Sequence, residues 1–214
     1  ATAFPPGEGW EYSNTNYVIL GMIAEQAAGD TYARLIQQYI IDPMGLTQTS
    51  VPETGDDFIP DPRLHGYTWA FSETLEWQDY TWLEPSWIFA AGNIISTLDD
   101  LYTMFSALIE GRFLSPEAHA QMWKLIQTHN PIQYGMGVSY LCDAGLRIYG
   151  HNGGMPGYET SAYRYNGLYV IVMTNGNAHP QNPLQSHTAD YIAKALAKAV
   201  FNRPAKLPRT ASAQ

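Results

Sequence analysis

The clearest chemical signal in the sequence is a tyrosine and an asparagine placed two residues apart at the start of an expected helix. Tyr12 is followed by Ser13 and Asn14, and apolar residues spaced by three and four begin directly behind them. A tyrosine beside cationic groups, which lower its pKa, can move a proton to and from a nucleophile. An asparagine can offer a donor and an acceptor to a substrate amide. The alternative is that Ser13 or Asn14 only caps the helix and that Tyr12 packs.

A second candidate is a histidine followed by paired glycines. His151-Asn152-Gly153-Gly154 comes directly after an expected strand over 146–150. Paired glycines let a substrate approach the backbone closely, and their N–H groups could stabilise an oxyanion. His151 could hold a proton or orient an anionic group. The alternative is an ordinary glycine-rich turn that carries an exposed histidine.

A third candidate is Trp87, which precedes Ala91-Gly92-Asn93. It could form the aromatic wall of a cleft, or it could be a core tryptophan. The six histidines show no spacing typical of metal ligands, and neither a phosphate loop nor a dinucleotide fingerprint occurs. The sequence therefore predicts no metal and no cofactor.

The secondary structure expected to position these residues is mainly helical in the first half of the chain and mainly strand in the second. Helices are expected up to Gly29, from Thr31 to a stop at 42–46, from 96 to Glu110, and after Ser115. Residues 50–90 lack sustained periodicity and are rich in Pro, Gly, Asp and aromatic residues. We expect long folded loops with short strands there, which in a compact domain usually form a binding surface.

Short strands are expected in the second half of the chain, over 134–141, 146–150, 161–165 and 168–174. Asn166-Gly167 between the last two predicts a hairpin, and a final helix is expected over about 186–201. The fold class is therefore α+β, an antiparallel sheet flanked by helices. Residues 1–214 are interpreted as part of a single domain, with a helical region at about 10–130 and the strands and last helix at about 134–202.

Charge, apolar run length and cysteine count exclude several classes of protein. The chain has 214 residues, with 20 Asp and Glu against 11 Lys and Arg, so a net charge of -9 argues against a nucleic-acid partner. No run of 18 apolar residues occurs, so no membrane span is expected. The single cysteine, Cys142, excludes an internal disulfide and a cysteine-rich zinc site. The first residues lack the features of a signal peptide, and we expect any export signal to lie upstream.

Several motifs recur in a family order over nearly the whole chain: Pro6-Gly7, Tyr12-Ser13-Asn14-Thr15-Asn16-Tyr17, Leu20-Gly21, Pro43-Met44-Gly45-Leu46-Thr47, Ala91-Gly92-Asn93-Ile94-Ile95-Ser96-Thr97-Leu98-Asp99-Asp100, Tyr134-Gly135-Met136-Gly137 and Gly150-His151-Asn152-Gly153-Gly154. Their order resembles the serine β-lactamase-like family. Its members include penicillin-binding proteins such as D-alanyl-D-alanine carboxypeptidases, class C β-lactamases, D-aminopeptidases and esterases. The resemblance implies a bacterial protein, periplasmic or secreted, with the β-lactamase/transpeptidase-like fold.

The resemblance implies acyl transfer through a serine, on a peptide or another small substrate. Tyr12 would relay a proton to the leaving group, and Asn14 would contact the acyl side-chain amide of the substrate. His151 would stand where many relatives carry the Lys of Lys-Thr-Gly, and it would keep the field around Tyr12 positive. The N–H of Gly154 would help to form the oxyanion hole, and Trp87 would line the cleft.

One departure from the family concerns the substrate. Asn152, next to Gly153, stands where relatives commonly carry the Thr or Ser that grips the carboxylate of penicillins and D-alanyl peptides. Alternatives to a carboxypeptidase or β-lactamase are therefore an esterase or a D-aminopeptidase of the same family. A non-catalytic binding module or an inactive fragment is the third possibility.

The other departure concerns the nucleophile. No serine is followed three residues later by lysine: Ser13 leads to Asn16, Ser96 to Asp99 and Ser161 to Arg164. The family uses a Ser-x-x-Lys upstream of Tyr-x-Asn, on a helix central to the fold. We therefore expect a complementary N-terminal chain to carry Ser-x-x-Lys. Without that chain the fold would be incomplete. One sheet edge would be exposed, and so would the face that the missing helix normally covers.

Overall fold

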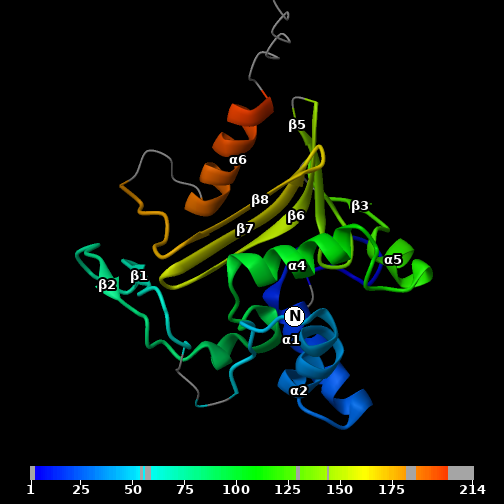
Figure 1. Cartoon of the computed structure of the whole chain (residues 1–214), viewed down its shortest axis with the longest axis horizontal. Helices are drawn as coiled ribbons and strands as arrows, with labels where there is room; N and C mark the ends of the chain where they lie inside the picture. Colours follow the sequence, from blue (N-terminus) through cyan, green and yellow to red (C-terminus); the bar gives the residue numbers. More distant parts are fainter. Residues whose placement is uncertain are drawn as a thin grey trace, which may run out of the picture.

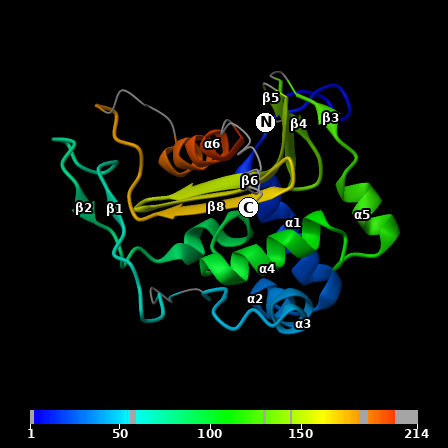
Figure 2. The same ribbon diagram turned by 45° about the horizontal axis from the view of Figure 1, so that its top comes forward.

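A six-stranded antiparallel sheet forms the centre of the protein (Figure 1). This computed structural model describes residues 3–53, 55, 59–128, 131–143, 145–181 and 187–201. The strands follow one another in chain order across the sheet: β3 (Ile126–Gln127), β4 (Gln133–Tyr134), β5 (Ser139–Asp143), β6 (Leu146–Met155), β7 (Tyr158–Tyr165) and β8 (Leu168–Thr174). Helix α6 (Thr188–Phe201) covers one face and α4 (Leu98–Ile109) the other (Figure 2). The predicted α+β fold is confirmed.

Each face of the sheet packs against its helix through an apolar cluster. On the α6 face, Ile148, Tyr165 and Val170 are buried together with Ala193 and Ala197. The α6 alanines recur every four residues on one side of the helix, and their small side chains let the helix lie close to the sheet. On the α4 face, a second cluster is formed by Phe105, Ile109 and Ala162.

The N-terminal helices follow the predicted caps. Helix α1 (Asn14–Ala28) begins after its N-cap Ser13 and ends at Gly29, whose φ of 71° is a left-handed C-cap. The second helical run comprises α2 (Tyr32–Ile36), the π-helical η1 (Gln37–Ile41) and α3 (Asp42–Met44). It ends at Gly45, where φ is 65°, within the predicted stop at 42–46.

One close contact fixes α1 against η2 (Pro85–Ala91), a 3₁₀ helix. Gly21 is buried on α1, and a Cβ atom placed there would lie 2.5 Å from the Cβ of Ala90 and 2.7 Å from Cε1 of Phe89. Only glycine allows the two backbones to approach this closely. The contact sets η2, which carries Trp87, against the helix that begins at Asn14.

The long loop region contains two short strands, as predicted. Strands β1 (Tyr67–Thr68) and β2 (Gln78–Asp79) pair in a separate two-stranded sheet. Beyond it, Thr97 caps α4, and Ser115 caps α5 (Pro116–Met122) by accepting the Ala118 N–H. Both predicted caps are therefore confirmed.

The strand predicted over 134–141 is wrong as a single element. It is divided into β4 and β5 by a tight turn in which the Gly135 N–H donates to the Val138 carbonyl at 2.8 Å. Gly137 has a φ of 74°, which interrupts the extended backbone. The prediction also omitted β3, which pairs with β4.

The strand predicted to end at Gly150 is longer than expected. Strand β6 continues to Met155, and each residue from 148 to 155 pairs with β7. His151-Asn152-Gly153-Gly154 is therefore strand, and the interpretation as a turn is wrong. Strand β8 occupies the predicted residues, and the hairpin at Asn166 and Gly167 has positive φ at both positions. Helix α6 begins at Thr188, and the predicted start at Ser186 lies outside the described residues.

The N-terminus of α6 is held to the sheet by one buried carboxylate. Glu159 of β7 accepts the N–H groups of Thr188 at 2.6 Å and Ala189 at 3.2 Å through Oε2. Its Oε1 accepts the N–H of Ala178 at 2.9 Å. A negative charge at a helix N-terminus is favourable because it faces the positive end of the helix dipole. Among the described helices, none is long and apolar enough to cross a membrane.

Candidate active site

Tyr12 and His151 meet although 139 positions separate them in the chain. Their ring centroids lie 5.8 Å apart at an interplanar angle of 41°. Tyr12 arrives from the segment before α1, and His151 from the part of β6 that extends beyond β5. Tyr12 is 44% exposed, so its hydroxyl-bearing ring is accessible from outside this chain.

At the start of α1, the residue that caps the helix differs from the two residues expected to take part in chemistry. Ser13 Oγ accepts the N–H of Thr15 at 3.2 Å and caps the helix. Asn14 is the first helical residue, and its Oδ1 accepts a hydrogen bond from the Tyr12 hydroxyl at 3.2 Å. Because Ser13 satisfies the cap, the side chains of Tyr12 and Asn14 are available for another role.

His151 uses both ring nitrogens within the chain. Nδ1 lies 2.6 Å from the Asn152 carbonyl, which can only accept, so Nδ1 carries a hydrogen. Nε2 lies 2.8 Å from the Tyr134 hydroxyl. In the neutral ring, Nε2 therefore accepts from Tyr134. These two contacts fix the ring beside Tyr12.

A tyrosine pair that the sequence interpretation missed completes this arrangement. The hydroxyls of Tyr17, on α1, and Tyr134, on β4, lie 2.5 Å apart, so a hydrogen-bonded chain runs from Tyr17 through Tyr134 to His151. Burial first, and then the contact with Tyr17, raise the pKa of Tyr134 far above its usual range. Tyr134 therefore remains a neutral phenol beside the imidazole. The sequence offered only the Tyr-Gly-Met-Gly motif, which carries no indication of this contact.

The electrostatics of Tyr12 differ from the expectation of a cationic surrounding. Burial, and to a lesser degree the neighbouring Tyr17, raise the pKa of Tyr12. A proton relay requires the opposite shift, toward the working pH. The described part of the chain does not lower this pKa, so a lowered value requires a positive charge supplied from elsewhere.

The glycine pair lies on a strand edge that has no neighbour among the described residues. Pairing between β5 and β6 ends at Ser139 and Gly150, and the residues beyond pair only with β7. The Gly150 carbonyl points to the β5 side, since it accepts from Ser139 Oγ at 2.6 Å. Backbone direction alternates along a strand, so the N–H of Gly154 also points to this open edge. This is the orientation that an oxyanion donor requires.

Asn152 points to the other face of the sheet. Its Nδ2 donates to Oδ2 of Asp190 on α6 at 2.6 Å. Adjacent side chains on a strand alternate between faces, so Asn152 cannot share the face of His151. The structure thus joins Tyr12, Asn14 and His151 but separates the Asn152 side chain from them.

Trp87 is not a core residue. It lies on η2 and is 61% exposed, so the interpretation as a buried tryptophan is wrong. The contact of η2 with Gly21 places it on the element that packs beside α1. Its role as a cleft wall remains a prediction.

Comparison with known proteins gives the site its context. The family model described as Beta-lactamase matches residues 1–196. The chain belongs to the beta-lactamase family. It is 34% identical over 175 residues to penicillin-binding protein 4* of Bacillus subtilis (strain 168), covering 76% of this chain and 38% of that protein. It is 27% identical over 191 residues to a D-aminopeptidase of Cereibacter sphaeroides (strain ATCC 17029), covering 82% and 34% of the two chains.

Solved structures of this family share the fold. A D-stereospecific amidohydrolase from Streptomyces sp. has a TM-score of 0.75 at 33% identity, over 81% of this chain and 52% of the other. The D-amino acid amidase of Ochrobactrum anthropi SV3, in complex with D-phenylalanine, has a TM-score of 0.77 at 25% identity, over 92% and 60%. The beta-lactamase-family chain described here thus spans little more than a third of these curated relatives and somewhat over half of these solved chains.

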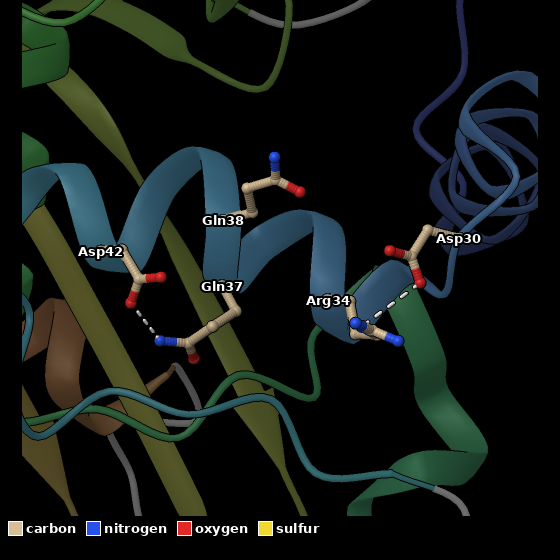
Figure 3. Close-up of a pocket in the computed structure, with 5 residues that line it drawn as sticks. All are labelled: Asp30, Arg34, Gln37, Gln38 and Asp42. Atoms are coloured by element: carbon tan, nitrogen blue, oxygen red, sulfur yellow. Dashed lines mark hydrogen bonds and ion pairs between the residues drawn. The ribbon is translucent and has the colours of Figure 1, made fainter.

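A polar pocket on the second helical run contains none of the candidate site residues. Figure 3 shows the side chains that line it: Asp30, Arg34, Gln37, Gln38 and Asp42. Arg34 pairs with Asp30 at 3.5 Å, and Gln37 donates to Asp42 at 2.5 Å, so its charges are largely satisfied internally. Figure 2 shows the helices α2 and α3 on the side of α4 that faces away from the sheet.

Proposed function

We propose that this chain supplies part of the active site of a serine hydrolase that cleaves amide or ester bonds through an acyl-enzyme. The observation that carries the proposal is the meeting of Tyr12 and His151 at the open edge of β6. The family, with its penicillin-binding proteins, D-aminopeptidase and amidases, supports the reaction class.

In the proposed reaction, a serine outside this sequence attacks the acyl carbon, and its proton passes to a neighbouring base. The bond to the leaving group breaks as Tyr12 delivers a proton to the departing nitrogen or oxygen and regains one from the protonated base. The developing oxyanion accepts hydrogen bonds from the N–H of Gly154 and from the nucleophile's own N–H. Asn14 would bind the acyl side-chain amide. Water then hydrolyses the ester and restores the serine.

A nucleophile outside this sequence accords with the surface of the chain. The middle of α1 exposes Ile19, Leu20, Met22 and Ile23, each between 49% and 58%. Strand β8 pairs only with β7 among the described residues, so one of its edges is open. Large exposed apolar faces and open edges are normally covered. A polypeptide that carries Ser-x-x-Lys would cover both and bring the positive charge that Tyr12 requires.

A second candidate is a D-aminopeptidase, D-amidase or esterase activity in place of carboxypeptidase or β-lactamase activity. Asn152 has no hydroxyl to offer a substrate carboxylate, and its side-chain amide already donates to Asp190. Uncharged D-amino-acid amides and simple esters do not need that group. The D-aminopeptidase and D-amidase relatives are consistent with this substrate class.

The experiment is intact-mass spectrometry of the native preparation before and after incubation with a penicillin, followed by turnover of D-phenylalaninamide and a simple ester. We expect the penicillin mass on a second polypeptide that carries Ser-x-x-Lys, and much slower uptake in Tyr12→Phe. A mass gain on the 214-residue chain itself would contradict the proposal and make Ser13 the first suspect. If no adduct forms and no amide or ester is cleaved, the binding-module alternative is favoured.

A further inference from the structure

His187, directly before α6, contacts the strand that carries the glycine pair. Its Nε2 lies 2.8 Å from the Gly153 carbonyl, and since a carbonyl can only accept, Nε2 carries a hydrogen. The same ring lies against the next residue, because a Cβ atom placed at Gly154 would be 3.4 Å from His187 Nε2. His187 was not among the residues that the sequence pattern identified.

The other side of the imidazole faces two carboxylates. Nδ1 lies 3.7 Å from Oε2 of Glu159 and 3.9 Å from Oδ1 of Asp190. Glu159 is itself fixed by three backbone N–H groups, and Asp190 is fixed by Asn152 of β6. His187 therefore stands at a helix end that is bonded to the sheet twice, through Glu159 and through Asp190.

Gly153 and Gly154 need such support more than most strand residues. Beyond Gly150, β6 has lost its β5 neighbour, so only β7 orders this part of the backbone within the described chain. Glycine also has the largest conformational freedom of any residue. An oxyanion donor works only if it is held in place before the reaction.

We propose that His187 is a positioning residue: its Nε2–H holds the Gly153 carbonyl and thereby fixes the N–H of Gly154 at the open edge of β6. The catalytic consequence rests on the proposed function, but the contact itself does not. Together with the Asn152–Asp190 hydrogen bond, it links the first turn of α6 to the strand that lines the site.

The test compares two isosteric variants. His187→Gln places an amide N–H where Nε2 lies, whereas His187→Asn places one where Nδ1 lies and removes the His187 donor from the Gly153 carbonyl, which then keeps only its pairing with β7. Backbone order parameters of 15N-labelled chain in the native preparation report on residues 152–154. We expect about 0.85 for wild type and H187Q and values falling below about 0.6 for H187N, with α4 unchanged as an internal control.

The acylation rate gives the second readout. In preparations that take up penicillin, we expect H187N to acylate about tenfold more slowly at saturation, with little change in half-saturating concentration, and H187Q to recover most of the rate. Equal order parameters in wild type, H187Q and H187N would overturn the proposal. Loosening in H187N without acylation of any preparation would overturn the proposed function while leaving the positioning contact supported.

A measurement on the wild type covers the case in which H187N does not fold. A long-range 1H–15N spectrum of the imidazole must show hydrogen on Nε2 of His187. A ring with its hydrogen on Nδ1 alone could not donate to Gly153 and would overturn the proposal.

Discussion

At the residue scale, the most informative contact is the one between Tyr134 and His151. Because Nδ1 is bound to a carbonyl and Nε2 to a phenol, His151 has no free nitrogen with which to grip a substrate carboxylate. Under the proposed function, its role is to present a fixed ring to Tyr12. A substrate carboxylate could bind only if Tyr134 released Nε2.

Tyr134→Phe tests that role. The change removes the hydroxyl that contacts both Tyr17 and His151 while leaving the ring to pack. Of the two hydrogen bonds lost, the one to His151, worth about 1 to 1.5 kcal/mol, fixes the ring, so its loss should slow penicillin acylation of the native preparation about tenfold. Intact-mass time courses measure the rate. Tyr39→Phe, at an exposed position on η1, is the matched control and should leave it unchanged; equal rates in both variants would contradict the role.

The sequence was sufficient to name Tyr12, Asn14 and His151 as candidates, and the structure brings their side chains together. Their catalytic roles stay a prediction. The sequence could not reveal Tyr17 with Tyr134, since those hydroxyls meet across 117 positions. The Asn152 assignment was incomplete for a different reason. Once β6 is known to continue past Gly150, strand alternation alone places Asn152 on the face opposite His151.

At the element scale, helix ends were more predictable than strand ends. The caps of α1, α4 and α5 follow from local side-chain chemistry, which the sequence shows directly. The division between β4 and β5 and the extension of β6 depend on which strand lies alongside. Such pairing is a tertiary property, and short apolar runs do not reveal it.

Gly21→Ala tests the contact between α1 and η2. In an open helix, alanine would stabilise by up to about 1 kcal/mol relative to glycine. Here the new methyl would overlap Ala90 and Phe89, so we expect a net loss of about 1 to 3 kcal/mol in the free energy of unfolding. Denaturant unfolding measures it. Gly176→Ala meets only ordinary contacts and should change stability by less than about 0.5 kcal/mol; a stabilised G21A would contradict the packing.

The β1–β2 pair should respond to acid through Asp79. Hydrogen bonds from the Thr81 side chain first, then from His65 and the Thr81 backbone, lower the pKa of Asp79 to about 2. A carboxylate with a lowered pKa adds stability above its ordinary pKa of 3.8, and that stability is lost as pH falls toward 2. We therefore expect Asp79→Asn to flatten the fall of Tm between pH 4 and 2. Asp143→Asn, on β5, controls for the loss of one charge; parallel curves for wild type and D79N would refute the assignment.

At the scale of the whole molecule, some helices and strands bury one part of their surface in the core and leave another apolar part, or a strand edge, exposed. Helix α4 buries Phe105 and Ile109 against the sheet, yet Leu98 and Tyr102 on the same helix are about half exposed. With α1 and the free edge of β8, they outline the surface that a further polypeptide would cover. Under the proposed function, this surface is where the polypeptide that carries Ser-x-x-Lys would bind.

That surface makes a prediction for hydrogen exchange. Binding of the polypeptide that carries Ser-x-x-Lys should slow amide exchange along β8 and reduce binding of an apolar dye, because it covers the open edge and the exposed side chains. Exchange in β5, which already has β4 and β6 as neighbours, is the control and should not change. Equal protection of β8 with and without the second polypeptide would show that the edge is not its binding surface.

The Glu159 carboxylate has a consequence for how this fold can vary. It accepts N–H groups from Ala178 on one side and from Thr188 and Ala189 on the other, so it fixes both ends of the connection into α6. Once the ends of a loop are fixed, doubling its length adds only about 0.6 kcal/mol of closure entropy. Residues inserted between these two fixed ends would therefore cost little closure entropy and would leave the contacts that hold the start of α6 in place.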